Sequence, residues 1–256
     1  MHLEFERDLA IRYKSLSQKI WVVSENWVNK EVYCPNCGNT HLYKYSNNKP
    51  AADFFCDNCN EDYELKSKGN GLGLKIVNGA YQGMFNRLQD VNSPNLFMLN
   101  YDSNSYLVSN FFVIPKHFFV PEIIEKRRPL SINARRAGWI GCNILLNKIP
   151  EVGRIFLIRD KQIVSKQKVC EIWQKTLFLR EEKKIGSRGW LLDIMRCIEF
   201  IRKKEFTIAD IYRFESILSK KHPDNRHIKD KIRQQLQILR DRNYIKFSGR
   251  GTYRIL

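Results

Sequence analysis

Residues 33–68 read YCPNCGNTHLYKYSNNKPAADFFCDNCNEDYELKSK and contain two C-x2-C pairs, Cys34 with Cys37 and Cys56 with Cys59. Eighteen residues separate the pairs. Four-thiolate zinc sites have this spacing, and a site with four protein ligands is closed and therefore structural. Unrelated core cysteines are the alternative, but two such pairs in one short segment favour a zinc ion held by all four thiolates.

The second C-x2-C pair is predicted to form the tight turn of a β-hairpin with arms over 49–55 and 60–68. If that turn is symmetric, facing residue numbers sum to 115, so Asp53 faces Asp62. Glu64 and Lys66 then lie on the same face because side chains alternate along a strand. Asp53 and Glu64 become diagonal neighbours about 7–8 Å apart, close enough for two carboxylates to bind one hard cation. We therefore expect the zinc knuckle to set the register of a magnesium site.

Composition is that of a globular chain. The 256 residues are 43% hydrophobic, which is enough for one large or two modest domains. The N-terminal residues are charged throughout, so they do not resemble a signal peptide, and no apolar run reaches membrane-spanning length. Cys142, Cys170 and Cys197 show no pairing pattern and are expected to pack as small hydrophobic residues in a reducing compartment. We expect a cytoplasmic protein without a membrane partner.

The charge is strongly basic and unevenly distributed. The net charge is +17, and residues 183–256 hold 19 Lys or Arg against 8 Asp or Glu. A basic surplus concentrated in one part of a chain indicates a polyanionic partner. Nucleic acid is the partner that this asymmetry favours.

Apolar patterning predicts an α/β arrangement before residue 183. Helical spacing runs from Leu9 to Trp27, and short apolar runs predict strands over Leu96–Tyr101, Asn110–Ile114 and Arg154–Arg159. Asn78 is predicted to cap a second helix, and a third helix is predicted over Ser165–Leu179. The glycine-rich segment 69–75 lacks the Gly-Lys-Ser/Thr of a phosphate-binding loop, so we expect a mobile loop beside the acidic site. Together these elements predict a mixed sheet flanked by helices.

A basic segment follows at 126–141, and its proline and glycines keep it out of long helices. Arg135 and Arg136 precede Trp139 by a few residues. The two arginines can place positive charge on phosphates, and the flat apolar ring of the tryptophan can fit a groove. A core tryptophan in a surface loop is an equally good interpretation of the pattern alone.

The last segment predicts three helices and a hairpin. Trp190, Ile194, Ile198 and Ile201 mark the first helix, and Thr207 with Asp210 forms a predicted capping box for the second. The third is expected from about residue 225 to 242, with Lys229, Arg233 and Gln234 on its polar face. A hairpin with Arg250 in its turn completes a winged-helix pattern, in which the third helix enters the major groove. We expect one domain over 1–182 and a winged helix over 183–256.

Five segments make the chain similar to a known family over its whole length: YCPNCGN, AADF with ELKSK, ARRAGWIGCN, RFES and IKDKIRQQLQILRD. The chain resembles the methyl-directed type II restriction endonucleases in which a nuclease domain of the PD-(D/E)xK class is joined to a winged helix. The implied fold class is α/β, a restriction-endonuclease-like mixed sheet with an inserted four-cysteine zinc site, followed by an α+β winged helix. Ala52 stands where the motif's name has proline, a tolerated departure.

The resemblance also implies an activity and its residues. Such enzymes cleave double-stranded DNA at GATC when the adenine carries an N6-methyl group, using Mg²⁺, and zinc has a structural role. The catalytic pair maps onto Asp53 and Glu64, the lysine onto Lys66, and the zinc ligands onto Cys34, Cys37, Cys56 and Cys59. Asp53, Glu64 and the carbonyl of Leu65 are then the expected Mg²⁺ ligands. Glu25 is a candidate for a further acidic residue of the site. The pattern is compatible with one catalytic ion or with two.

Recognition of the methyl group needs an apolar surface in the major groove. We expect Trp139 to supply it, while residues of the winged helix read the same site; these are His227, Lys229, Arg233 and Gln234, with Arg250 on the backbone. We expect the protein to be a monomer in solution. A zinc-ribbon and winged-helix regulator that binds DNA without cutting it is the alternative of another class. An RNA-processing nuclease is disfavoured because the third helix does not fit the narrow major groove of A-form RNA.

Overall fold

The structure is a computed structural model that describes residues 1–46, 52–88, 93–182 and 184–256. The chain divides into two compact units. The first comprises Met1–Asn147 with Val152–Leu177, and the second comprises Lys148–Glu151 with Phe178–Leu256. Among the described helices, none combines the length and apolar composition needed to cross a membrane.

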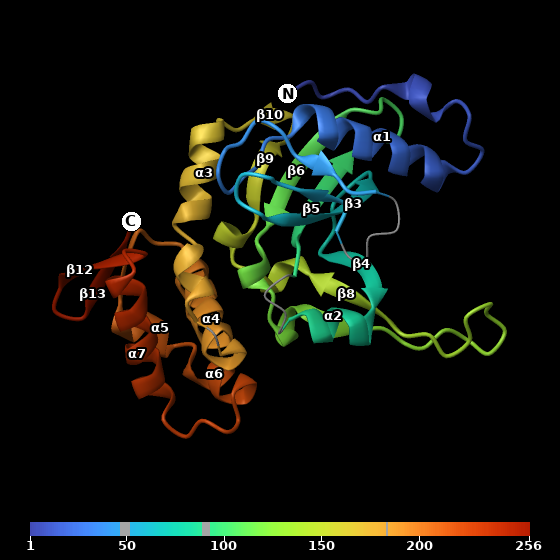
Figure 1. The fold of residues 1–256 in the computed structure, drawn as a ribbon. Coiled ribbons are helices and arrows are strands. Elements are labelled where there is room, and N and C mark those ends of the chain that lie inside the picture. Colours follow the sequence, from blue (N-terminus) through green and yellow to red (C-terminus); the bar gives the residue numbers. More distant parts are fainter. Residues whose placement is uncertain (47–51, 89–92, 183) are drawn as a thin grey trace. The chain divides into compact units, whose positions relative to one another are not determined.

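The first unit is built on a mixed sheet (Figure 1). Within the described residues its strand order is β1-β2-β3-β5-β6-β9-β10. Strands β3 and β5 are parallel, and the other neighbours are antiparallel. The strands are β1 (Tyr43–Lys44), β2 (Phe54–Phe55), β3 (Asp62–Gly69), β5 (Asn95–Tyr101), β6 (Val108–Ile114), β9 (Ile155–Arg159) and β10 (Gln162–Ile163).

The three strands predicted from apolar runs are confirmed as β5, β6 and β9. Their residues are apolar because the sheet is covered on both faces. Every residue of β5 is buried. On one face Trp27 of α1 (Leu16–Glu31) packs edge-on against Phe111, with ring centroids 5.2 Å apart. Val169 and Trp173 of α3 (Lys166–Gln174) belong to the same core cluster. The helices at residues 16–31 and 166–174 thus cover the sheet as the flanking helices that the sequence predicts.

Two helical predictions need correction. The first helix begins at Leu16, and Leu9 lies in a separate 3-10 turn, η1 (Arg7–Ala10). The predicted helix over Ser165–Leu179 ends as α3 at Gln174, because Thr176 donates its hydroxyl to the Trp173 carbonyl at 2.7 Å. The chain continues as the 3-10 helix η6 (Leu177–Arg180). Further 3-10 turns are η2 (Lys116–Phe118), η3 (Pro121–Ile123), η4 (Leu146–Lys148) and η5 (Glu151–Gly153).

A second sheet lies beside the first in this unit, in the order β4-β8-β7. Its strands are β4 (Lys75–Ala80), β8 (Gly141–Leu145) and β7 (Ile124–Lys126), and α2 (Tyr81–Arg87) follows β4 directly. The prediction that Asn78 caps this helix is wrong, because Ala80 occupies the N-cap position. Asn78 lies in β4, where its Oδ1 accepts from the backbone of Gly79 at 2.8 Å.

The second unit contains the predicted hairpin, but its described residues form four helices where three were predicted, because a turn at 213–214 divides the second helix in two. Its elements are α4 (Ile185–Ile201), β11 (Glu205–Thr207), α5 (Ile208–Tyr212), α6 (Glu215–Lys221), α7 (Ile228–Asp241), β12 (Ile245–Gly249) and β13 (Thr252–Ile255). The capping box of Thr207 and Asp210 is present. Ile232, Leu236 and Leu239 of α7 are buried, as the helical spacing predicts. The third strand, β11, pairs with β13 and was missed, since three residues give no periodicity.

Candidate active site and nucleic-acid interface

The four cysteines of the two C-x2-C pairs converge. Cys34 Sγ lies 3.5 Å from Cys59 Sγ, and Cys37 Sγ lies 3.6 Å from Cys56 Sγ. All four sulfurs lie within 4.8 Å of one another. Thiolates at this separation fit a tetrahedral zinc ion, whose Zn–S bonds are about 2.3 Å long. Among the described residues no other group of three or more Cys, His, Asp or Glu side chains converges in this way.

Both knuckles have the same backbone geometry. The N–H of Cys34 donates to Asn39 O, and that of Cys56 donates to Glu61 O, five residues on in each case. The residue before each acceptor, Gly38 or Asn60, has a positive φ, +75° and +56° respectively. Such a φ is favourable for glycine and tolerated by asparagine. Each knuckle therefore closes two residues later in the chain than a turn that is symmetric about its cysteines.

These two further residues change the predicted register. Phe54 pairs with Tyr63 and Phe55 with Asp62, so facing residue numbers sum to 117 instead of 115. Asp53 therefore does not face Asp62. Its N–H donates to Tyr63 O at 2.9 Å, and its Oδ2 accepts from the N–H of Leu65 at 2.6 Å. Continuing this register puts Asp53 directly across from Glu64 instead of diagonal to it. The predicted first arm also includes residues 49–51, which lie outside the described ranges.

A cavity of about 230 Å³ opens at this edge of the sheet. Asp53, Glu64, Leu65 and Lys66 all line it, and Glu25 of α1 lines it from the other side. Trp21, Ser24, Ala52 and Ser67 complete the lining. The structure therefore brings together every residue of the acid, acid and lysine pattern, and adds the acidic residue that the sequence suggested from the first helix.

Lysines and an arginine balance the acids around the cavity. Lys66 Nζ lies 2.6 Å from Glu64 Oε1, and Arg87 of α2 lies 3.6 Å from Glu64 Oε2. Lys44 Nζ lies 2.5 Å from Glu25 Oε2 and 5.3 Å from the centre of the Trp21 ring. Each of these carboxylates is therefore paired with a cationic side chain, and Glu64 contacts two of them.

Burial raises the pKa of two of these carboxyl groups. For Asp53 desolvation is the main cause; the hydrogen bond from Leu65 opposes it, and the nearby charge of Glu64 adds to it. For Glu25 desolvation again dominates, partly offset by Lys44. A bound divalent cation would favour the ionised form of both groups. The donor set, carboxylate oxygens and a backbone carbonyl, is the kind that Mg²⁺ prefers.

Sequence reasoning missed Trp21, Lys44 and Arg87. Trp21 shares the α1 face of Glu25, and Lys44 reaches the site because Lys44 pairs with Phe54 next to Asp53. Arg87 comes from α2, after the strand that was not predicted. No local pattern marks these residues, because strand pairing and helix packing, not spacing in the sequence, bring them to the cavity.

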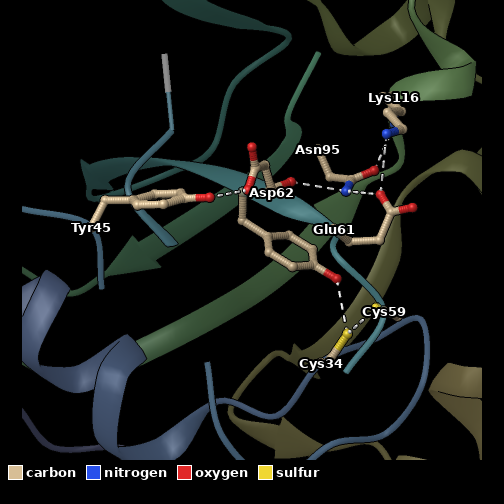
Figure 2. Close-up of polar contacts among 8 residues, drawn as sticks. Cys34, Tyr45, Cys59, Glu61, Asp62, Asn95 and Lys116 are labelled. Atoms are coloured by element: carbon tan, nitrogen blue, oxygen red, sulfur yellow. Dashed lines mark hydrogen bonds and ion pairs between the residues drawn. The ribbon is translucent and has the colours of Figure 1, made fainter. Parts of the chain in front are cut away.

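A buried polar network connects the zinc cluster to strand β3 (Figure 2). Tyr63 Oη lies 3.1 Å from Cys34 Sγ. Asn95 donates to Glu61 Oε2 at 2.8 Å and to the carbonyl of Asp62 at 2.9 Å, and Lys116 Nζ lies 3.5 Å from Glu61. Tyr45 donates to Asp62 Oδ1 at 2.7 Å. These contacts fix the start of β3 next to the second knuckle.

The basic segment between β7 and β8 is an arm with its own support, and Figure 1 shows it running away from the sheet. Leu130 N donates to Trp139 O and Gly138 N donates to Leu130 O, at 2.9 and 3.1 Å. A Cβ on Gly141 would lie 2.8 Å from the Trp139 ring, so the indole packs on this glycine. Trp139 is half-buried, and Arg135 and Arg136 are exposed. The tryptophan therefore belongs to the arm and not to the core.

In the second unit the predicted polar face of α7 is exposed. Lys229, Arg233 and Gln234 point to solvent, with His227 at the N-cap and Arg250 in the hairpin turn. Lys229 Nζ lies 5.6 Å and Arg233 Cζ 5.8 Å from the centre of the Tyr212 ring. Arg233 also pairs with Asp230 at 3.2 Å, and Gln234 Oε1 accepts from Lys231 Nζ at 2.7 Å. Tyr212, which the sequence did not single out, thus supports two cations of the candidate DNA-contacting face.

Comparison with protein families gives two matches that together span nearly the whole chain. The model of DpnI, described as the Dam-replacing family, matches residues 1–182. A second model, described as the Dam-replacing HTH domain, matches residues 186–255. The first match covers the four-cysteine cluster, the acidic cavity and the basic arm, and the second covers the winged helix.

Proposed function

The chain belongs to the DpnI, or Dam-replacing, family, and from this membership we propose that it is a methyl-directed type II restriction endonuclease. The family supports a restriction-enzyme-like activity with DNA as the partner. The finer proposal is cleavage of double-stranded DNA at GATC sites whose adenine carries an N6-methyl group, by Mg²⁺-dependent hydrolysis of the phosphodiester. The rest of this function depends on what the acidic cavity can do.

The observation that supports hydrolysis most directly is the composition of that cavity. Asp53, Glu64 and Lys66 come from two strands that the zinc knuckle joins, and all three line one space together with Glu25. Burial raises the pKa of two of these carboxyl groups, Asp53 and Glu25. Perturbed carboxyl groups gathered in a cavity are typical of functional sites.

We propose the following roles. Asp53, Glu64 and the Leu65 carbonyl would hold Mg²⁺, and a bound ion would supply polarisation of the scissile phosphate and acidification of a water. Lys66 leaves its partner Glu64, orients that water and offsets the charge that develops on the phosphate. Lys44 partly offsets the burial that raises the pKa of Glu25 at the wall of the cavity, and Arg87 offsets the charge of Glu64. Main-chain donation from Leu65 fixes the Asp53 carboxylate before the ion arrives.

Recognition of the methyl group is proposed to involve both units. The N6-methyl group lies in the major groove, and an apolar ring next to it favours the methylated base over the unmodified one. Trp139 is such a ring, and it lies between the exposed pair Arg135 and Arg136 and the glycine that supports it. The exposed face of α7 supplies hydrogen-bonding groups for the same short site, with Arg250 in the hairpin turn available for a phosphate.

The decisive experiment is one digestion series. Plasmids with GATC sites methylated on both strands, on one strand or on neither are incubated with the protein, with and without Mg²⁺. We expect cleavage of the fully methylated plasmid only when Mg²⁺ is present. Asp53→Asn should abolish it, whereas Asp62→Asn is a matched control, because Asp62 begins the neighbouring strand β3, does not line the cavity and accepts from Tyr45.

A DNA-binding regulator would give a different result. Such a protein would shift the methylated plasmid in a gel and leave it intact at every Mg²⁺ concentration. The zinc cluster and the winged helix are compatible with that function, but the grouping of Asp53, Glu64 and Lys66 would then have no role.

A further inference from the structure

One fully buried residue contacts both the zinc cluster and the catalytic pair. The Tyr63 hydroxyl lies 3.1 Å from Cys34 Sγ, and Figure 2 draws this contact at Cys34. Its carbonyl accepts from the N–H of Asp53 at 2.9 Å. Its neighbour in the chain is Glu64, whose side chain lies in the acidic cavity. Two sites that share no ligand are therefore joined through one residue.

The ring of Tyr63 is held firmly in this position. It stacks on Phe97 of β5 with centroids 4.4 Å apart and an interplanar angle of 8°. Its backbone is opposite Phe54 on one side and Asn95 on the other. A side chain so constrained cannot turn its hydroxyl elsewhere, and a buried hydroxyl without a partner is unfavourable. Cys34, which is equally buried, is the acceptor that the fold provides.

The chemistry of this pair has a direction when zinc is bound. A tyrosine hydroxyl keeps its proton at neutral pH and donates it, and a zinc-bound thiolate has no proton and accepts. Partners in the outer shell of a metal orient its ligands, and loss of one typically weakens metal affinity about 10- to 100-fold. The Tyr63 hydroxyl is placed to do this for Cys34.

We propose that Tyr63 is a positioning residue that couples the zinc site to the catalytic cation site. Its hydroxyl holds the Cys34 thiolate, and its backbone holds Asp53 across from Glu64, so that zinc occupancy stabilises the register on which Mg²⁺ binding depends. The second half of this inference rests on the proposed nuclease function, whereas the first half concerns zinc alone.

The variant Tyr63→Phe tests the first half because it removes only the hydroxyl. The matched control is Tyr45→Phe, since Tyr45 donates to Asp62 on the same strand but does not contact a cysteine in the network of Figure 2. Zinc transfer from each purified protein to a chromogenic chelator is followed over time. We expect transfer about 10-fold faster from Tyr63→Phe than from wild type, and no change for Tyr45→Phe. Equal rates in all three proteins would overturn the proposal.

A spectroscopic reading separates a lost hydrogen bond from a general loosening of the fold. In cobalt-substituted protein the thiolate-to-cobalt absorption reports the electron density on sulfur. Loss of a donor to Cys34 should move that band to lower energy in Tyr63→Phe and leave it unmoved in Tyr45→Phe. An unshifted band together with a lower unfolding temperature would assign Tyr63 a packing role only.

The second half is tested by the Mg²⁺ dependence of cleavage. Tyr63→Phe should need several-fold more Mg²⁺ for half-maximal cleavage, while its rate at saturating Mg²⁺ approaches that of wild type. Altered zinc transfer with an unchanged Mg²⁺ requirement would refute the coupling. If the wild type cleaves no substrate, the nuclease function itself is wrong, but the zinc and cobalt measurements still decide the role of the hydroxyl.

Discussion

The ionised carboxylate of Asp53 is in an energetically unfavourable environment, which a bound cation or a proton relieves. Its carboxylate lies in the cavity, and burial raises its pKa. Replacing it with Asn keeps the acceptor for the N–H of Leu65 and removes the charge. We expect Asp53→Asn to lower the cleavage rate by about 100-fold or more, the scale on which one electrostatic group acts in a catalytic site. Without Mg²⁺ at neutral pH the same variant should unfold at a higher temperature than wild type.

Both effects are measured on one preparation, by plasmid cleavage and by differential scanning calorimetry. Asp62→Asn serves as the control for each. A lower unfolding temperature for Asp53→Asn in the absence of Mg²⁺ would show that the ionised carboxylate stabilises the fold, contrary to its raised pKa.

The same pKa shifts predict how stability depends on pH. Asp53 and Glu25 have pKa values above those of ordinary carboxyl groups, which lie near 4 in an unfolded chain. At a pH between the unfolded-state and the folded-state pKa of each group, the folded protein therefore binds more protons than the unfolded chain. Their contribution to stability is fully present below about pH 4 and is lost as the pH rises through the folded pKa values.

This dependence is isolated by comparing wild type with the double variant Asp53→Asn, Glu25→Gln in urea unfolding from pH 4 to 8 without Mg²⁺. The difference in free energy of unfolding should grow in favour of the double variant as the pH rises. Saturating Mg²⁺ should reverse it for wild type at pH 7. A difference independent of pH would contradict the shifts.

At the scale of the elements, the second knuckle depends on the conformation of Asn60. Its φ of +56° is in the left-handed region, and Gly38 occupies the equivalent position of the first knuckle. Asn60→Gly should therefore keep the stability and zinc content of the wild type. Asn60→Val should lower the free energy of unfolding by about 1–2 kcal/mol, the cost of that conformation for a residue with a crowded Cβ. Chemical denaturation of the zinc-loaded proteins gives the comparison, and equal stability of the two variants would refute it.

Helix α7 gives a prediction about salt. Lys229 is exposed near the start of the helix, 3.4 Å from Glu215 and above the Tyr212 ring. If it contacts a phosphate, Lys229→Ala should reduce the slope of log affinity against log salt by about 1. Arg242→Ala is the matched control, because Arg242 follows the other end of the helix and pairs with Glu181. Binding titrations in Ca²⁺ at several salt concentrations measure both slopes, and equal slopes for the two variants would remove Lys229 from the interface.

The elements show what the sequence could predict. Strands β5, β6 and β9 were found because they are short apolar runs buried on both faces. The register of β2 with β3 was missed by two in the residue sum, because one left-handed residue in the knuckle does not change the cysteine spacing. Asn78 was assigned to a helix cap because its neighbours have helical spacing, but its strand β4 forms only through pairing with β8, more than sixty residues away. Non-local pairing leaves little trace in local composition.

At the scale of the whole molecule, composition was informative about the two parts of the chain, but it did not predict how the site is assembled. The surplus of positive charge after residue 183 and the four cysteines marked two units of different kinds before any coordinates. The acid, acid and lysine pattern also placed three lining residues of the cavity. Lys44 and Arg87 could not be predicted, because their distance from Glu25 and Glu64 depends on packing between elements that the sequence specifies only jointly.

The last prediction concerns how the two units share recognition. Trp139 packs on Gly141 within its own arm, and Gln234 lies on α7 in the other unit, paired with Lys231. Each variant, Trp139→Ala or Gln234→Ala, should lower the preference for methylated over unmodified DNA by about 10-fold, within the range for one base contact. Residues without shared partners contribute additively to free energy, so the double variant should lose about 100-fold. Competition cleavage of labelled duplexes measures the preference. A double variant no worse than either single one would mean that the two residues act at one contact, and recognition would then belong to one unit alone.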